Sequence, residues 1–148
     1  MYNQPEVALE KYELTVSRII KGRGAYICDT GIGQKLLVPY RGHEQRACTL
    51  RDTLAFIQRN GMDVEQISQT KEQCIISRDN CEDAYILKDY RAGRECSTDS
   101  IDDMRGGSRA LAQLHNILEK YPLPSDIEVE SLHEKSQRKL SLIHISEP

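Results

Sequence analysis

The sequence lacks tryptophan and has a single phenylalanine among its 148 residues, so leucine, isoleucine, valine and tyrosine must form the core. No apolar run approaches the roughly 20 residues that a membrane-spanning helix requires. The N-terminus has no basic region followed by an apolar one, as a secretory signal would. The sequence therefore predicts a chain of about one domain, with no membrane partner and no export signal.

An excess of basic residues is also missing. Lysine and arginine number 20 against 23 aspartates and glutamates, which gives a formal net charge of −3. Proteins that bind nucleic acids generally need a basic stripe that displaces counterions from the phosphates. The charge balance therefore argues against a nucleic-acid partner.

Metal-ligand patterns are absent as well. The five cysteines form no C-x-x-C pair, and the four histidines share no ligand spacing with them. We therefore expect no metal site, and reduced thiols in a cytoplasmic compartment. A disulfide between Cys74 and Cys81, which flank an expected turn, is the alternative.

What the sequence does contain is a series of short strand patterns. The segment 12–20, YELTVSRII, alternates apolar and polar residues, and AYICDT and QKLLVPY follow it after the glycine turns GRG and GIG. These patterns predict three antiparallel strands. Because Pro39 has no N–H to donate, it either closes the third strand or places that strand at a sheet edge.

The apolar period then changes to three and four residues. Ala47, Leu50, Leu54 and Ile57 would share one face of a helix that ends at Asn60-Gly61. The segments QCIISR and AYILKDY predict two further strands around the turn DNCED. Three strands, a helix and two strands indicate an α+β fold, a five-stranded antiparallel sheet with one helix on its face.

A second helix is expected after the glycine-containing connector RAGREC. Ser100 and Asp103 have the spacing of a capping box, and the apolar residues after them recur at helical intervals. Gly106-Gly107 either kinks this helix or permits close packing. The apolar face would consist of Ile101, Met104, Leu111, Leu114 and Leu118.

The glycine turn at residues 22–24 does not match the common phosphate-binding motifs. Ile27 stands where a dinucleotide fingerprint has its third glycine, and a strand follows instead of a helix. No Walker A sequence is present. Two interpretations remain, an ordinary tight turn or a glycine hairpin of the kind that covers nucleotide phosphates in kinase-type folds.

Three segments, YELTVSRIIKGRGAYICDTGIGQKLLVPYRG, AYILKDYRAGREC and RALAQLHNIL, resemble the N-terminal part of the spore-coat CotS family of Firmicutes. That family is similar to aminoglycoside and choline phosphotransferases. The resemblance runs from about residue 12 to residue 139. It implies a protein-kinase-like N-lobe with its connector at 11–97 and the first helix of a truncated C-lobe at 98–139. Residues 1–10, which precede the first strand pattern, are expected to be a leader.

The resemblance also implies a nucleotide site. A kinase-type third strand usually offers a lysine to the phosphates, but the matching place here holds Val38 or Pro39. Lys35 lies three residues before Val38 and is expected to point to the opposite face of the sheet. The expected nucleotide-binding residues are Gly22, Arg23 and Gly24 in the turn, Lys35, Glu44, and Asp89, Tyr90 and Arg91 in the connector.

Several of these residues have an alternative role. Glu44 either pairs with a lysine or is a favourable charge in the first turn of a helix. Lys88 either approaches a nucleotide or is a solvated strand lysine. His115 is more typical of helix packing than of catalysis.

Catalytic motifs are missing from this chain. Nothing after Gly93 resembles H-x-D-x-x-x-x-N or D-F-G, so no catalytic residue is assigned, and we expect this chain alone not to transfer phosphate. For a longer parent, the resemblance implies ATP and magnesium as cofactors, the missing C-lobe and other spore-coat proteins as partners, and the mother-cell cytoplasm or the coat as location. It leaves open whether the parent is a phosphotransferase or a non-catalytic, pseudokinase-type scaffold for coat assembly. A stand-alone α+β interaction domain is the third alternative.

The final segment differs from the rest of the chain. Residues 140–148, LSLIHISEP, are identical to an in-frame translation of a common transposase sequencing adapter. A natural amphipathic tail is the alternative. We interpret the segment as read-through sequence, exclude it from the fold, and expect the genuine chain to end near Lys139.

Overall fold

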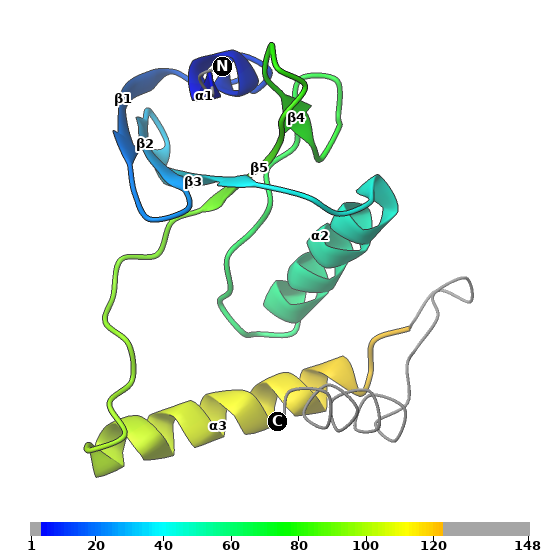
Figure 1. The fold of residues 1–148 in the computed structure, drawn as a ribbon. Coiled ribbons are helices and arrows are strands. Elements are labelled where there is room, and N and C mark those ends of the chain that lie inside the picture. The colour runs from blue at the N-terminus through cyan, green and yellow to red at the C-terminus, as the bar shows by residue number, and fades with distance from the viewer. Residues whose placement is uncertain (1–3, 123–148) are drawn as a thin grey trace, which may run out of the picture.

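The computed structural model describes residues 4–122, so the expectations for residues 123–148 lie outside the described residues. Figure 1 shows a twisted sheet above two helices, joined by an extended connector. The elements in chain order are α1 (Pro5–Leu9), β1 (Val16–Lys21), β2 (Tyr26–Thr30), β3 (Gly33–Pro39), α2 (Glu44–Arg59), β4 (Ser77–Arg78), β5 (Ala84–Asp89) and α3 (Ile101–Leu118).

The five strands form one antiparallel sheet in the order β1-β2-β3-β5-β4. This confirms the expected α+β fold class. Pro39 pairs with Tyr85 at the end of β3. Because β3 is the central strand, Pro39 closes it and does not mark an edge.

One side of the sheet faces α1 and is called the α1 side. Side chains alternate along a strand, so Cys28 of β2, Leu37 of β3 and Leu87 of β5 point to this side, where they are fully buried. Ala8 and Leu9 of α1 are buried in the same cluster. The segment expected as a leader at residues 1–10 therefore contains a helix, whose five residues are too few to reveal an apolar period.

The opposite side of the sheet faces α2 and is called the α2 side. Ala47 of α2 packs with Ile67, Ile75 and Ile86 in a second buried cluster. Leu50, expected on the apolar face, is 46% exposed. The helix therefore covers only the part of the sheet near β5. Gly61, with φ +95°, takes the left-handed conformation that ends α2, as expected from the Asn60-Gly61 pair.

The second long helix, α3, begins as the sequence predicts. The Ser100 side chain accepts a hydrogen bond from the Asp103 N–H, and the helix continues unbroken through Gly106-Gly107. Of the two alternatives for Gly106-Gly107, a kink or close packing, the continuous helix does not favour the kink. Phe56 of α2 and Tyr121, just beyond α3, form an edge-to-face ring contact with centroids 5.1 Å apart. The α3 residues Ile101, Met104 and Leu111 are exposed.

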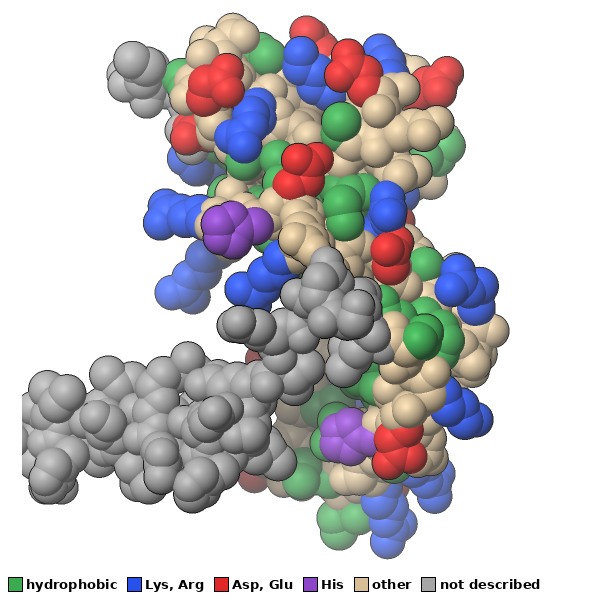
Figure 2. All heavy atoms as spheres, turned by 90° about the vertical axis from the view of Figure 1, so that its right-hand side faces the viewer, with side chains coloured by type: hydrophobic (Ala, Val, Ile, Leu, Met, Phe, Trp, Pro, Cys, Tyr) green, Lys and Arg blue, Asp and Glu red, His purple; other side chains and the backbone are tan. Residues whose placement is uncertain are grey.

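On the face drawn in Figure 2, the sheet-containing part carries charges of both signs. Hydrophobic side chains reach the surface in the lower part of that view, which contains α2 and α3. None of the five cysteines, all within the described part of the chain, forms a disulfide, so Cys74 and Cys81 are not linked. Among the described helices, none is long and apolar enough to cross a membrane.

Candidate functional site

The glycine turn joins β1 to β2 as a tight hairpin. The Gly22 N–H donates to the Ala25 carbonyl at 2.8 Å, and Arg23 is exposed at the tip. Gly24 has φ +77°, a conformation that side chains disfavour, so the turn requires glycine there. The turn lies at the end of the sheet where β3 ends, whereas the connector leaves from the opposite end of the strands.

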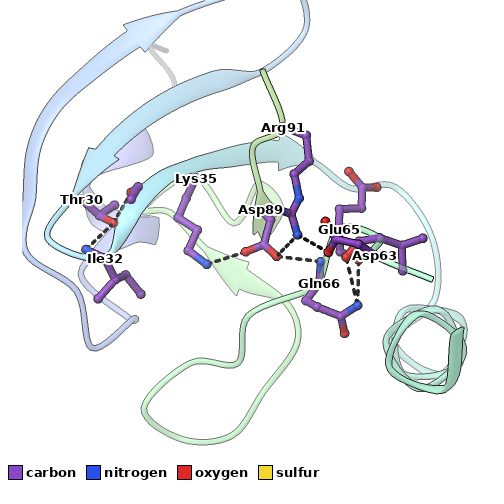
Figure 3. Close-up of polar contacts among 10 residues, drawn as sticks. Thr30, Ile32, Lys35, Asp63, Glu65, Gln66, Asp89 and Arg91 are labelled. Carbon is purple, nitrogen blue, oxygen red and sulfur yellow. Dashed lines mark hydrogen bonds and ion pairs between the residues drawn. The ribbon is translucent and has the colours of Figure 1, made fainter. Parts of the chain in front are cut away.

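Lys35 lies on the α1 side of the sheet, together with Leu37. Its Nζ is 2.6 Å from Oδ1 of Asp89, its direct partner in the β3–β5 ladder (Figure 3). The two side chains are only 14% and 24% exposed. Val38 pairs with Ile86 and points to the α2 side. The inference that Lys35 and Val38 face opposite sides is therefore confirmed.

Asp89 has further partners beyond Lys35. Its Oδ2 accepts the Gln66 N–H at 3.0 Å and lies 3.9 Å from Arg91, which itself pairs with Asp63 at 2.9 Å (Figure 3). Burial opposes ionisation of Asp89, but the hydrogen bonds from Lys35 and Gln66 and the two positive charges outweigh it. The pKa of the Asp89 carboxyl is consequently held below its usual value.

The start of the connector is tied to the sheet by its backbone. The Asp89 N–H donates to the Gln66 carbonyl at 3.0 Å, and the Tyr90 N–H donates to the Gln34 carbonyl at 3.3 Å. These two N–H groups belong to connector residues that were expected to bind a nucleotide, and both are engaged within the protein. A base at the connector would have to use other groups.

Glu44 is exposed in the first turn of α2. Lys35, the lysine that it was considered to pair with, lies on the α1 side and binds Asp89. The structure therefore does not bring Glu44 and Lys35 together, and the position of Glu44 suits the favourable helix charge.

The α2 side carries a feature that sequence reasoning missed. Ile20, Ile27 and Leu36 are direct neighbours across β1, β2 and β3, and alternation places all three on the α2 side. We call them the aliphatic row. Ile20 is 38% exposed, and Ile27 and Leu36 are half-buried, because α2 does not extend over them.

Lys88 continues this row on β5. It pairs directly with Leu36, and its Nζ is 3.0 Å from Oε1 of Glu65 in the segment after α2. The alternation of residues in ILKD indicates in the sequence that Lys88 and Leu87 point to opposite sides of a strand. Only the register between β3 and β5, however, places Lys88 beside Leu36. The described residues thus combine an aliphatic surface with a cation on one face of the sheet.

Within residues 4–122, no three His, Cys, Asp or Glu side chains gather closely enough to hold a metal ion. Magnesium is accordingly assigned to none of them.

No protein-family model matches the sequence, and no curated protein does. Among solved structures, an aminoglycoside phosphotransferase from Alicyclobacillus acidocaldarius subsp. acidocaldarius DSM 446 has a similar fold, with a TM-score of 0.75 and 13% sequence identity. The match covers 98% of this chain and 43% of that chain, so this chain spans less than half the length of that protein. The chain therefore has the fold of the N-terminal part of a kinase-like phosphotransferase.

Proposed function

We propose that this chain is the nucleotide-binding N-terminal part of a kinase-like phosphotransferase, and that the nucleotide lies on the α2 side of the sheet. The observation that carries the proposal is the aliphatic row of Ile20, Ile27 and Leu36 beside Lys88. The likeness of the fold to an aminoglycoside phosphotransferase supports it.

The chemistry of the face suits a nucleotide. A purine ring is flat and largely apolar, and covering the exposed part of Ile20 would gain about 25 cal/mol for each Å² of apolar surface removed from water. The glycine turn lies at one end of the same strands. Gly22 and Gly24 have no side chain to hold a ligand away from their backbone.

ATP is the proposed nucleotide, and when bound it would supply the phosphoryl group that a phosphotransferase transfers. The residues present fit its base and one phosphate charge, through the aliphatic row and Lys88. They include no carboxylate cluster for magnesium within the described range. Transfer itself would need residues of a longer parent chain.

The sequence resemblance of residues 12–139 supports a finer proposal. The parent would be a CotS-like protein associated with the spore coat, with other coat proteins as partners and the mother-cell cytoplasm or the coat as its location. Only the three matched segments support this proposal. Recovery of a spore-coat fraction enriched in the full-length parent would test it, and an even distribution between vegetative cells and spores would contradict it.

A second candidate, a non-catalytic scaffold with a degenerate kinase fold, is favoured by one observation. The α2-side positions of β3 are Gln34, Leu36 and Val38, and the strand's lysine, Lys35, is bound to Asp89 on the other side. The central strand therefore offers no amine to a nucleotide on the α2 side.

Titration of the 148-residue chain with ATP, followed by NMR or calorimetry, separates the two candidates. We expect saturable binding with a Kd of about 1 mM or tighter. Ile20→Glu places a charge in the aliphatic row and should weaken binding about tenfold. Ile32→Glu is the matched control, because Ile32 is 71% exposed in the β2–β3 turn, and it should leave binding unchanged. No saturable ATP binding by the wild-type chain would reject nucleotide binding and favour the scaffold.

A further inference from the structure

Two lysines occupy adjacent register positions of the β3–β5 ladder but point to opposite sides of the sheet. Lys35 pairs with Asp89, and the next pair is Leu36 with Lys88. Since Leu87 and Asp89 point to the α1 side, Lys88 between them points to the α2 side. We infer that Lys88, and not Lys35, binds the phosphate groups of the nucleotide. This inference rests on the proposed function.

Lys35 is unsuited to this role for three reasons. It lies on the side covered by α1, beside the fully buried Leu37 and Cys28. Its side chain is 14% exposed. Its partner Asp89 is itself fixed by the Gln66 N–H, so release of Lys35 would leave a half-buried carboxylate without its closest positive charge.

Lys88 has the opposite properties. Its contact with Glu65 is a single ion pair at 3.0 Å, and the two side chains are 27% and 40% exposed. This pair is more exposed than that of Lys35 and Asp89, so water screens it more and it is the weaker of the two. An exchange of the Glu65 carboxylate for a phosphate oxygen therefore has a small cost, and a lysine ammonium suits phosphate as a compact point charge.

The neighbouring charges fit this assignment. Arg18 and Asp29, which stand opposite each other in the β1–β2 register, lie on the same side, two register positions further from the glycine turn, and Asp29 accepts a hydrogen bond from the Gln34 side chain at 2.9 Å. Glu65 is the acidic group nearest to the Lys88 ammonium. It therefore competes with an anionic ligand for the lysine, and its removal should favour the ligand.

The test compares two methionine variants of the full 148-residue chain against ATP, ADP and adenosine. Lys88→Met should weaken ATP and ADP at least about tenfold and leave adenosine within about twofold, since adenosine has no phosphate. Lys35→Met, the matched control, should leave the affinity for all three ligands within about twofold but lower the melting temperature. Glu65→Gln should tighten ATP about twofold or more without changing adenosine.

The outcomes separate this inference from the proposal beneath it. Equal losses of ATP and adenosine on Lys88→Met, or a phosphate-dependent loss on Lys35→Met instead, would overturn the role of Lys88 and leave nucleotide binding intact. If Lys88→Met does not fold by circular dichroism, Glu65→Gln decides, and unchanged or weaker ATP binding by that variant rejects the inference. Failure of the wild-type chain to bind either ATP or adenosine would reject the proposed function and this inference together.

Discussion

The ion pair between Lys35 and Asp89 should contribute measurably to stability, which most ion pairs at protein surfaces do not. Its side chains are 14% and 24% exposed, and the Nζ–Oδ1 distance is 2.6 Å. Breaking a fully buried pair costs about 3–5 kcal/mol, whereas an exposed pair contributes about 0–1 kcal/mol. Because this pair lies between those limits, we expect Lys35→Met to lower the free energy of unfolding by about 1–3 kcal/mol.

A double-mutant cycle isolates the interaction from the other contacts of Asp89. The variants are Lys35→Met, Asp89→Asn and the double variant, each unfolded in urea and followed by circular dichroism. We expect a coupling energy of about 1–2 kcal/mol, within the range for contacting residues. A coupling energy below about 0.3 kcal/mol, the level of independent sites, would refute the reasoning.

The pH dependence of the same pair follows from its pKa. The pKa of Asp89 is lower in the folded chain than the value of 3.8 that an unperturbed aspartate has. The stabilisation is therefore fully present above that unfolded value and is lost as the pH falls through the folded pKa. Urea unfolding at pH 7 and at successively lower pH should show the difference between wild type and Asp89→Asn diminishing below about pH 4.

Three further predictions concern the core and the turns. Leu37→Ala removes a fully buried side chain and should lower the free energy of unfolding in urea by about 2–5 kcal/mol. Leu50→Ala, at an exposed position, should lower it much less. Equal losses in the two variants would contradict the packing described. Burial raises the pKa of the Cys28 thiol to about 11. Iodoacetamide should therefore alkylate Cys28 in the native chain far more slowly than the exposed Cys96, and mass spectrometry would measure both rates. Equal rates would disprove the burial of Cys28. Asp79→Asn should lower the thermal midpoint measured by circular dichroism. The reason is that the Asp79 carboxylate accepts hydrogen bonds from the N–H groups of residues 4, 81 and 83 and from a tyrosine hydroxyl. An unchanged midpoint would argue against this network.

The sequence predicted those turns and helix ends that depend only on residues next to each other in the chain. Gly24 indicated the β1–β2 turn because few other residues tolerate its φ of +77°. Ser100 and Asp103 indicated the start of α3, which the observed cap confirms. The end of α2 followed in the same way from Asn60-Gly61.

Features that depend on distant segments could not be predicted in this way. Lys35 and Asp89 are 54 residues apart, and only the β3–β5 register brings them together. The exposure of Leu50 depends on how far α2 extends over the sheet, which its own apolar period does not reveal. For the same reason the aliphatic row was missed, since its three members come from three strands and none is unusual alone.

The two ends of the connector are held by different contacts, and these contacts limit which backbone dihedrals of the connector can rotate. At the sheet end, Tyr90 donates to Gln34 and Arg91 pairs with Asp63. At the helix end, Arg94 pairs with Asp103 of α3. Ala92 and Gly93 are the two residues between these anchors, and both are exposed. A rotation of their backbone dihedrals would change the orientation of α3 relative to the sheet and keep both anchors, but it would break the ring contact between Phe56 and Tyr121.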